Sequence, residues 1–150
     1  MKESPEMQRL EDTLRRSNIT AGGFLGDDRR PLTEIIDYDM AQLSHAGYSP
    51  EQVGDRMRQI TEKAVTGLGN WIEISEKLQA RTTEAKGRIP CPWPHPARFD
   101  KRVTEVYNKV YDKHIKWSDL SIHLIAEHGF FEGKNAFFRI EPLELISIIF

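Results

Sequence analysis

The chain has 150 residues, of which 39% are hydrophobic and 29% are charged, and its net charge at pH 7 is −2. This composition excludes wholesale disorder, and the length suffices to bury a core without a stapling disulfide or metal. The single cysteine excludes an internal disulfide framework, and no apolar run reaches the roughly 18–20 residues of a membrane-spanning helix. We therefore expect one cytoplasmic domain over residues 1–150, with no membrane partner.

The charges are unevenly distributed along the chain. Residues 1–76 carry 9 Lys/Arg against 14 Asp/Glu, whereas residues 77–116 carry 10 against 4. A basic block beside an acidic one is typical either of an anion-binding face or of charges that pair within the molecule.

The first part of the chain has the patterns of helices. Good helix formers run from Pro5 to about Ser17, although the apolar stripe there is thin. Apolar residues then recur at helical spacing from Pro31 to Ala46, and Gly47 follows as a stop.

The next helix has the clearest start in the sequence. Ser49 is a good N-cap, Pro50 suits the first helical position, and Gln52 stands where it completes a capping box. Together with the preceding helix it should form a helical hairpin, so residues 1–69 are expected to be mainly helical.

Residues 70–150 mix strand and helix patterns. Segments rich in β-branched and aromatic residues predict strands, and a Ser-capped segment that ends before a glycine predicts a helix. These patterns predict an α+β domain, with an N-terminal helical hairpin followed by a small antiparallel sheet and two short C-terminal helices. The expected strands are 71–74, 78–85, 103–111, 113–117 and 136–140, and the expected helices are Ser118–His128 and a last one that Pro142 opens.

The segment Gly87–Pro96 contains four prolines in seven residues. Because proline fixes its own φ and makes the preceding residue extended, we expect a stiff, extended arm with few hydrogen bonds. The arm holds Cys91 and His95. Its extended form should keep these two side chains beyond hydrogen-bond reach, which argues against a catalytic pair.

Two further histidines, His123 and His128, lie on the predicted helix. With Cys91 and His95 they give the spacings C-x3-H and H-x4-H, a ligand set that suits tetrahedral zinc. Four protein ligands would make a closed structural site, whereas three ligands and a water would make a hydrolytic one.

The helix geometry limits this hypothesis. Residues five apart on a helix point about 140° apart, so His123 and His128 share a metal only if the helix ends at His128. The alternatives are that His128 is a packed helix-end histidine and His123 a solvated one paired to carboxylates. Asp119, His123 and Glu127 could also form a metal-binding face of their own, because they are spaced i, i+4, i+8.

The basic block predicts a second kind of site. Positive side chains attract phosphates, and aromatic rings stack on unpaired bases, so the block could bind single-stranded nucleic acid or a phosphorylated ligand. A basic sheet face that pairs with the acidic helices would explain the same pattern. The residues of this hypothesis are Arg81, Lys86, Arg88, Arg98, Lys101 and Arg102, with Trp93 for stacking.

Apolar residues near the C-terminus are candidates for partner contacts. In Phe130-Phe131 we expect one core ring and one partly exposed ring, and a similar pair follows at Phe137-Phe138. The apolar segment 143–150 should belong to the core, or be covered by a protein partner or a second copy in a homodimer.

These observations favour a small non-catalytic binding module whose zinc site joins the Pro-rich arm to the helix Ser118–His128. Binding of nucleic acid or a phosphorylated ligand is the first alternative, and a metal-dependent hydrolase is the second.

Overall fold

The computed structural model describes residues 4–16 and 23–150. It has the expected α+β architecture, and the described part of the first helix spans Pro5–Arg16, since Ser17, the predicted end, lies outside the described residues. In chain order the elements are α1 (Pro5–Arg16), α2 (Leu32–His45), α3 (Pro50–Val65), β1 (Ile72–Glu73), β2 (Leu78–Pro90), β3 (Arg98–Asn108), β4 (Lys113–Ser118), α4 (Asp119–His128) and α5 (Pro142–Ile149).

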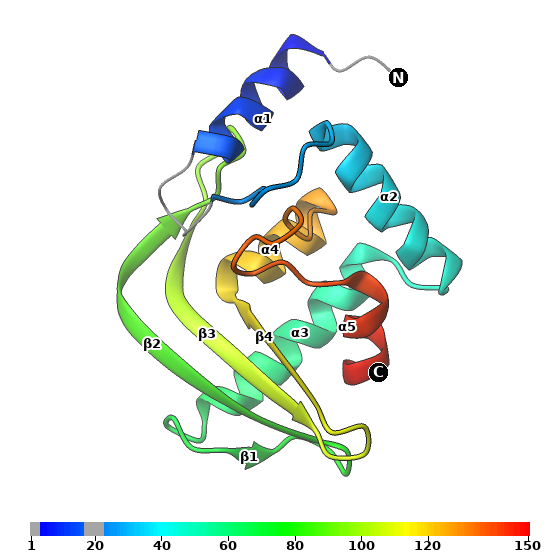
Figure 1. Cartoon of the computed structure of the whole chain (residues 1–150). Helices are drawn as coiled ribbons and strands as arrows, with labels where there is room; N and C mark the ends of the chain where they lie inside the picture. Colours follow the sequence, from blue (N-terminus) through cyan, green and yellow to red (C-terminus); the bar gives the residue numbers. More distant parts are fainter. Residues whose placement is uncertain (1–3, 17–22) are drawn as a thin grey trace.

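The predicted start of α3 is confirmed in detail. The Ser49 side chain accepts a hydrogen bond from the Gln52 backbone N–H at 3.2 Å, and the Gln52 side chain accepts one from the Ser49 backbone N–H at 2.8 Å. A short turn joins α2 to α3, as expected. The two helices then diverge: α3 packs against the sheet and α4, whereas α2 contacts α1 and α5 (Figure 1).

The strands form one antiparallel sheet in the order β1-β2-β3-β4. Side chains alternate between its faces. Ala80, Val106 and Trp117 lie on the inner face, which α3 and α4 cover, and all three are fully buried. On the outer face Arg81 pairs in register with Glu105, which pairs with Lys116.

Three sequence predictions require correction. The strand predicted at 136–140 does not form, and this segment consists of turns and coil. Strand β2 extends to Pro90 after a register shift between Ala85 and Arg88, so the first residues of the expected proline-rich arm pair with β3. Phe130 and Phe131 are both buried, at 1% and 2% exposure, whereas one exposed ring was expected.

The buried side chains form two hydrophobic clusters. The larger one lies between the sheet, α3 and α5, and it includes Trp117 and most of the apolar C-terminus. The smaller one joins α1, the start of α2 and α4, and it includes Cys91. None of the described helices is long and apolar enough to cross a membrane.

Candidate metal centre

The expected extended arm holds for residues 87–90, which belong to β2, but is wrong from Cys91 onward, where the loop to β3 is compact. The Cys91 N–H donates to the Ala97 carbonyl at 2.9 Å and closes the loop. Inside it the His95 N–H donates to the Trp93 carbonyl at 2.8 Å, and the Ala97 N–H donates to the His95 carbonyl at 3.1 Å. These i to i+2 bonds are γ-turns.

Every backbone N–H between Cys91 and Ala97 is used within this loop. Prolines at 92, 94 and 96 have no N–H to satisfy, and the remaining one, that of Trp93, hydrogen-bonds the Cys91 sulfur. The backbone N–H groups of the loop therefore all find acceptors within the loop itself. Its curvature brings Cys91 and His95 to one side, so these two side chains are not kept apart as an extended arm would keep them.

The condition on the helix is also met, because α4 ends at His128. Gly129 takes the left-handed conformation at φ 61°, and its N–H closes the helix on the Ile125 and Leu124 carbonyls. The positive φ favours glycine at this position, and a Cβ there would also lie 2.8 Å from the sulfur of the flexible Met40 side chain. The His128 side chain thus leaves the last turn of α4, where it can turn toward His123.

Four ligand atoms converge between the loop and α4. One atom from each of Cys91, His95, His123 and His128 lies within 4.8 Å of all the others. The Nε2 atoms of His95 and His128 are 3.0 Å apart, and those of His123 and His95 are 3.3 Å apart. The Cys91 Sγ lies 3.5 Å from the His128 Nε2.

These distances are close to the edges of a zinc tetrahedron. With zinc at about 2.0–2.1 Å from nitrogen and about 2.3 Å from sulfur, tetrahedral angles set nitrogens about 3.3–3.4 Å apart and nitrogen and sulfur about 3.6 Å apart. With these three distances near tetrahedral edges and all four ligand atoms within 4.8 Å of one another, the cluster could hold a metal ion.

Hydrogen bonds alone do not account for this arrangement. A neutral imidazole nitrogen carries either one hydrogen or one lone pair, so it makes one well-directed hydrogen bond. The Nε2 of His95 has two close Nε2 neighbours, and the Nε2 of His128 has a nitrogen and a sulfur neighbour. A cation at the centre would take a lone pair from each of the four atoms at once.

An apolar shell surrounds the cluster. The Trp93 ring stacks on the His128 ring with centroids 4.2 Å apart and planes 11° apart, and Phe130 packs against Trp93 at 5.4 Å. Phe99 packs against the His123 ring at 4.6 Å. The sequence analysis missed this shell. Its only sequence signal was an aromatic residue beside each ligand-bearing segment.

The shell also sets the protonation of the ligands. Burial, followed by repulsion from His123 and His95, lowers the pKa of His128 to about 4. Burial and then His95 lower the pKa of His123 as well. Both imidazoles are therefore neutral near pH 7, with lone pairs that a metal can use. Burial raises the pKa of the Cys91 thiol, so metal binding there would have to displace a proton.

The carboxylate–histidine face is not available as a separate metal site. Arg102 binds Asp119 at 2.9 Å, and this ion pair occupies the first carboxylate of the i, i+4, i+8 series. Burial raises the pKa of Asp119, an effect that Arg102 opposes. His123 itself points to His95 rather than to either carboxylate.

The basic residues of the second hypothesis are divided in the fold. Arg81 binds Glu105 at 2.8 Å, Arg88 binds Asp100 at 3.4 Å, and Arg102 binds both Asp119 and Glu84. Trp93, proposed to stack on a base, packs on His128 instead. Lys86, Arg98 and Lys101 are exposed and form no ion pair within the described chain. Nucleic-acid binding through this set stays a prediction.

Comparison with known proteins adds no assignment. No family model matches the chain, and no curated protein or solved structure is significantly similar to it. The function is therefore inferred from the geometry of the site.

Proposed function

We propose that this chain is a non-catalytic binding module, held together by one Zn²⁺ that Cys91, His95, His123 and His128 coordinate. The observation that carries the proposal is the convergence of four ligand atoms within 4.8 Å of one another, from two segments far apart in sequence. The ion would tie the β2–β3 loop to the end of α4.

The choice of zinc rests on the donor set. One thiolate and three imidazoles are borderline-soft ligands, and a compact four-atom cluster favours tetrahedral coordination over the octahedral oxygen sites of magnesium or calcium. Zinc meets both preferences and brings no redox chemistry to the buried thiolate.

The number of ligands supports a structural role. With four protein ligands a tetrahedral ion has no position left for water, and hydrolytic zinc sites keep such a position open. The backbone N–H of Trp93 on the Cys91 sulfur and the apolar shell are the surroundings that a closed site needs.

The test is the metal content of the purified protein by native mass spectrometry and elemental analysis. We expect one zinc per wild-type chain and a loss of zinc in Cys91→Ala and His95→Ala. His114→Ala is the matched control, because His114 is an exposed histidine outside the cluster and its loss should leave the zinc in place. Wild-type protein without stoichiometric metal, even after refolding with zinc, would refute the proposal.

A metal-dependent hydrolase remains the second candidate, and one observation favours it. A pocket of about 240 Å³ borders His123 and is lined by Glu127, Asp119 and Arg102, so a three-ligand site would have polar groups beside it. Cobalt-substituted protein separates the two readings. The visible spectrum of a closed site should not change with azide, whereas an open site would bind azide and shift its bands.

A further inference from the structure

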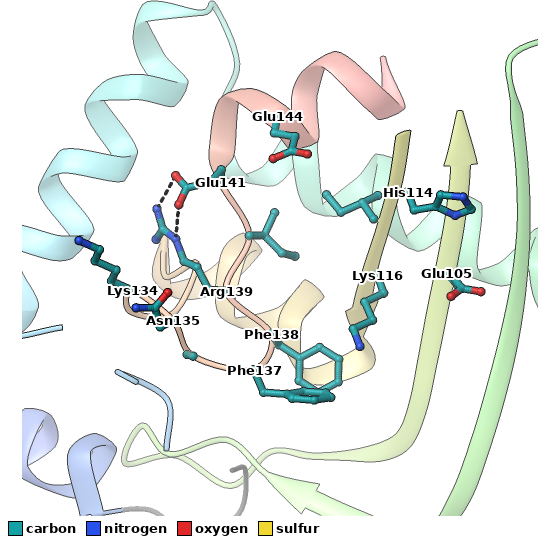
Figure 2. A pocket seen from close by; sticks show the side chains of 13 residues that line it. Glu105, His114, Lys116, Lys134, Asn135, Phe137, Phe138, Arg139, Glu141 and Glu144 are labelled. Atoms are coloured by element: carbon teal, nitrogen blue, oxygen red, sulfur yellow. Dashed lines mark hydrogen bonds and ion pairs between the residues drawn. The ribbon is translucent and has the colours of Figure 1, made fainter. Parts of the chain in front are cut away.

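A groove runs along the β4 edge of the sheet, and none of the four candidate ligands lines it. Among the described residues, β4 pairs with β3 alone, so its other edge has no strand partner there. Three consecutive β4 residues, His114, Ile115 and Lys116, form one wall of the groove. The segment 134–141 and Glu144 of α5 form the other side, and the enclosed volume is about 600 Å³ (Figure 2).

The far wall has the sequence of a strand but does not pair with β4. Its backbone N–H groups are used elsewhere: that of Ala136 donates to the Gly133 carbonyl, that of Arg139 to the Ala136 carbonyl, and that of Ile140 to the Phe131 carbonyl. The Arg139 side chain fixes the segment to the buried Asp39 of α2 at 3.0 Å. The wall is therefore held apart from β4, and a gap separates the two.

We propose that this groove binds an extended peptide of another protein, which adds to β4 as a further strand. An unpaired strand edge offers N–H and C=O groups to such a peptide, and flanking pockets select alternate side chains. The volume of about 600 Å³ lies within the roughly 300–1,000 Å³ of ligand sites. The inference rests on the proposal that the domain is a binding module, but not on the metal.

The two faces of β4 define the side chains of the peptide. A strand paired with β4 points alternate side chains to the inner face, where Ile115 and Ile140 line the groove, and to the outer face, where His114 and Lys116 lie. Apolar side chains fit the inner positions. The outer positions lie beside Lys116, whose Nζ is 4.4 Å from the ring centre of the half-exposed Phe137.

The charges of the groove favour acidic side chains at the outer positions. Its carboxylates Glu105 and Glu141 are bound by Arg81 at 2.8 Å and by Arg139 at 3.1 Å. Among the described residues that line the groove, Lys116 and Lys134 form no ion pair. Glu144, at the α5 end, is the one carboxylate among these lining residues that has no ion-pair partner (Figure 2). An alternation of apolar and acidic residues therefore matches the middle of the groove.

A second copy of the chain is a poor occupant. Two β4 strands paired edge to edge would bring Lys113 and Lys116 of one copy beside those of the other. Like charges on neighbouring strands destabilise the pairing, and lysines on edge strands are a common protection against self-association.

The probe is a fluorescein-labelled hexapeptide in which valine and glutamate alternate, with binding followed by fluorescence anisotropy. We expect it to bind the wild-type protein and to bind Lys116→Glu at least tenfold more weakly. A peptide with lysine in place of glutamate should show the opposite preference. Lys86→Glu is the charge-matched control, because Lys86 is exposed and outside the groove. This variant should bind the glutamate peptide with the affinity of the wild type.

A version of the peptide methylated at alternate backbone nitrogens tests the strand addition itself, and it should lose binding. The inference would be overturned if Lys116→Glu bound the peptide as tightly as the wild type, or if the methylated peptide bound as tightly as the unmethylated one. It would also be overturned if the wild type bound neither the glutamate nor the lysine peptide. Dimerisation through β4 in sedimentation experiments would overturn it as well. Zinc content is measured on every sample. If the wild-type protein retains zinc but does not bind the peptide, the peptide-groove inference fails and the zinc proposal stands.

Discussion

At the scale of single residues, Glu132 is the least satisfied group in the described chain. It is 3% exposed, its φ of 68° is unusual for a non-glycine residue, and its Oε1 has no hydrogen-bond partner among the described residues. Burial raises its pKa from 4.5 to about 8, although the nearby Arg139 opposes this effect. Glu132 is therefore a neutral acid at pH 7 in the folded protein.

This shift predicts how stability depends on pH. In the unfolded chain Glu132 ionises above about pH 4.5, whereas in the folded protein it stays protonated to about pH 8, so its contribution to stability falls as pH rises across that window. Glu132→Gln imitates the neutral acid and should remove the fall. We expect the variant to match the wild type near pH 4 and to exceed it by a few kcal/mol at pH 8, given about 1.4 kcal/mol per pKa unit.

The measurement is urea unfolding of both proteins from pH 4 to pH 9. The difference between them isolates Glu132 from His128, whose lowered pKa makes the stability of the metal-free protein rise with pH from about 4 to 6.5. A difference that does not change with pH would show that Glu132 is ionised in the folded protein.

Trp93 is expected to act on the metal without binding it. Its ring covers one face of the His128 ring at 4.2 Å, and removing such outer support typically weakens metal binding. Trp93→Ala should therefore keep one zinc but bind it about tenfold more weakly, in line with other outer-shell substitutions. Competition with a chromophoric chelator measures the affinity. Trp71→Ala, at a partly exposed tryptophan outside the shell, should leave it unchanged, and equal affinities for all three proteins would contradict the role of the shell.

At the scale of the elements, the close approach of α3 to α4 holds the helix that carries two of the ligands. A Cβ at Gly54 in α3 would lie 2.6 Å from the Ala126 Cβ in α4. Gly54→Ala gains up to about 1 kcal/mol of helix propensity, but overpacking costs about 1–3 kcal/mol, so we expect a net loss of stability. Ala126→Gly in the same chain should restore the space. Thermal unfolding of the two single variants and the double variant forms the cycle, and additive effects would contradict the contact.

The elements that could be predicted are those whose signals are local. The Ser49 and Ser118 caps, with Gly129 after α4, set helix ends through bonds within five residues, and these predictions are confirmed. The strand at 136–140 failed for the opposite reason. Its residues suit a strand, but Arg139 binds Asp39, a hundred residues away, and local turns use the N–H groups.

In the candidate site too, local sequence patterns could be predicted, whereas contacts between distant segments could not. Residue types and spacings picked out the four residues that converge, since C-x3-H and H-x4-H are visible in the sequence. Their convergence depended on two features that spacing does not encode: the γ-turns that bend the proline-rich loop, and the point at which α4 ends. The aromatic shell and the groove at β4 come from contacts between distant segments, which one sequence does not reveal.

At the scale of the whole molecule, the candidate ligand cluster lies beside the smaller of the two hydrophobic clusters, to which Cys91 belongs. The long hairpin of β2 and β3 carries its loop to the end of the sheet near α1, away from β1 (Figure 1). There Cys91 packs in the smaller hydrophobic cluster with Leu10 and Leu14 of α1, and Pro92 to Pro94 line a pocket with residues of the same helix. The loop, α1 and the end of α4 thus depend on one another, whereas α3 and the middle of the sheet share the larger cluster.

Removal of the metal should therefore loosen one end of the molecule and leave the other folded. A ligand that binds only the folded state stabilises it by about 2.7 kcal/mol at a hundred times its dissociation constant, so a strong chelator should lower the melting temperature of the wild type. Hydrogen exchange should accelerate in residues 91–97, α1 and the last turn of α4, and stay slow in α3 and in β3 next to β4. Cys91→Ala, which lacks a ligand, should show the fast pattern already and should not respond to the chelator. Uniform acceleration along the chain would mean that the metal stabilises the whole fold, and unchanged exchange would mean that the loop is held by its own hydrogen bonds and by the packing of Trp93.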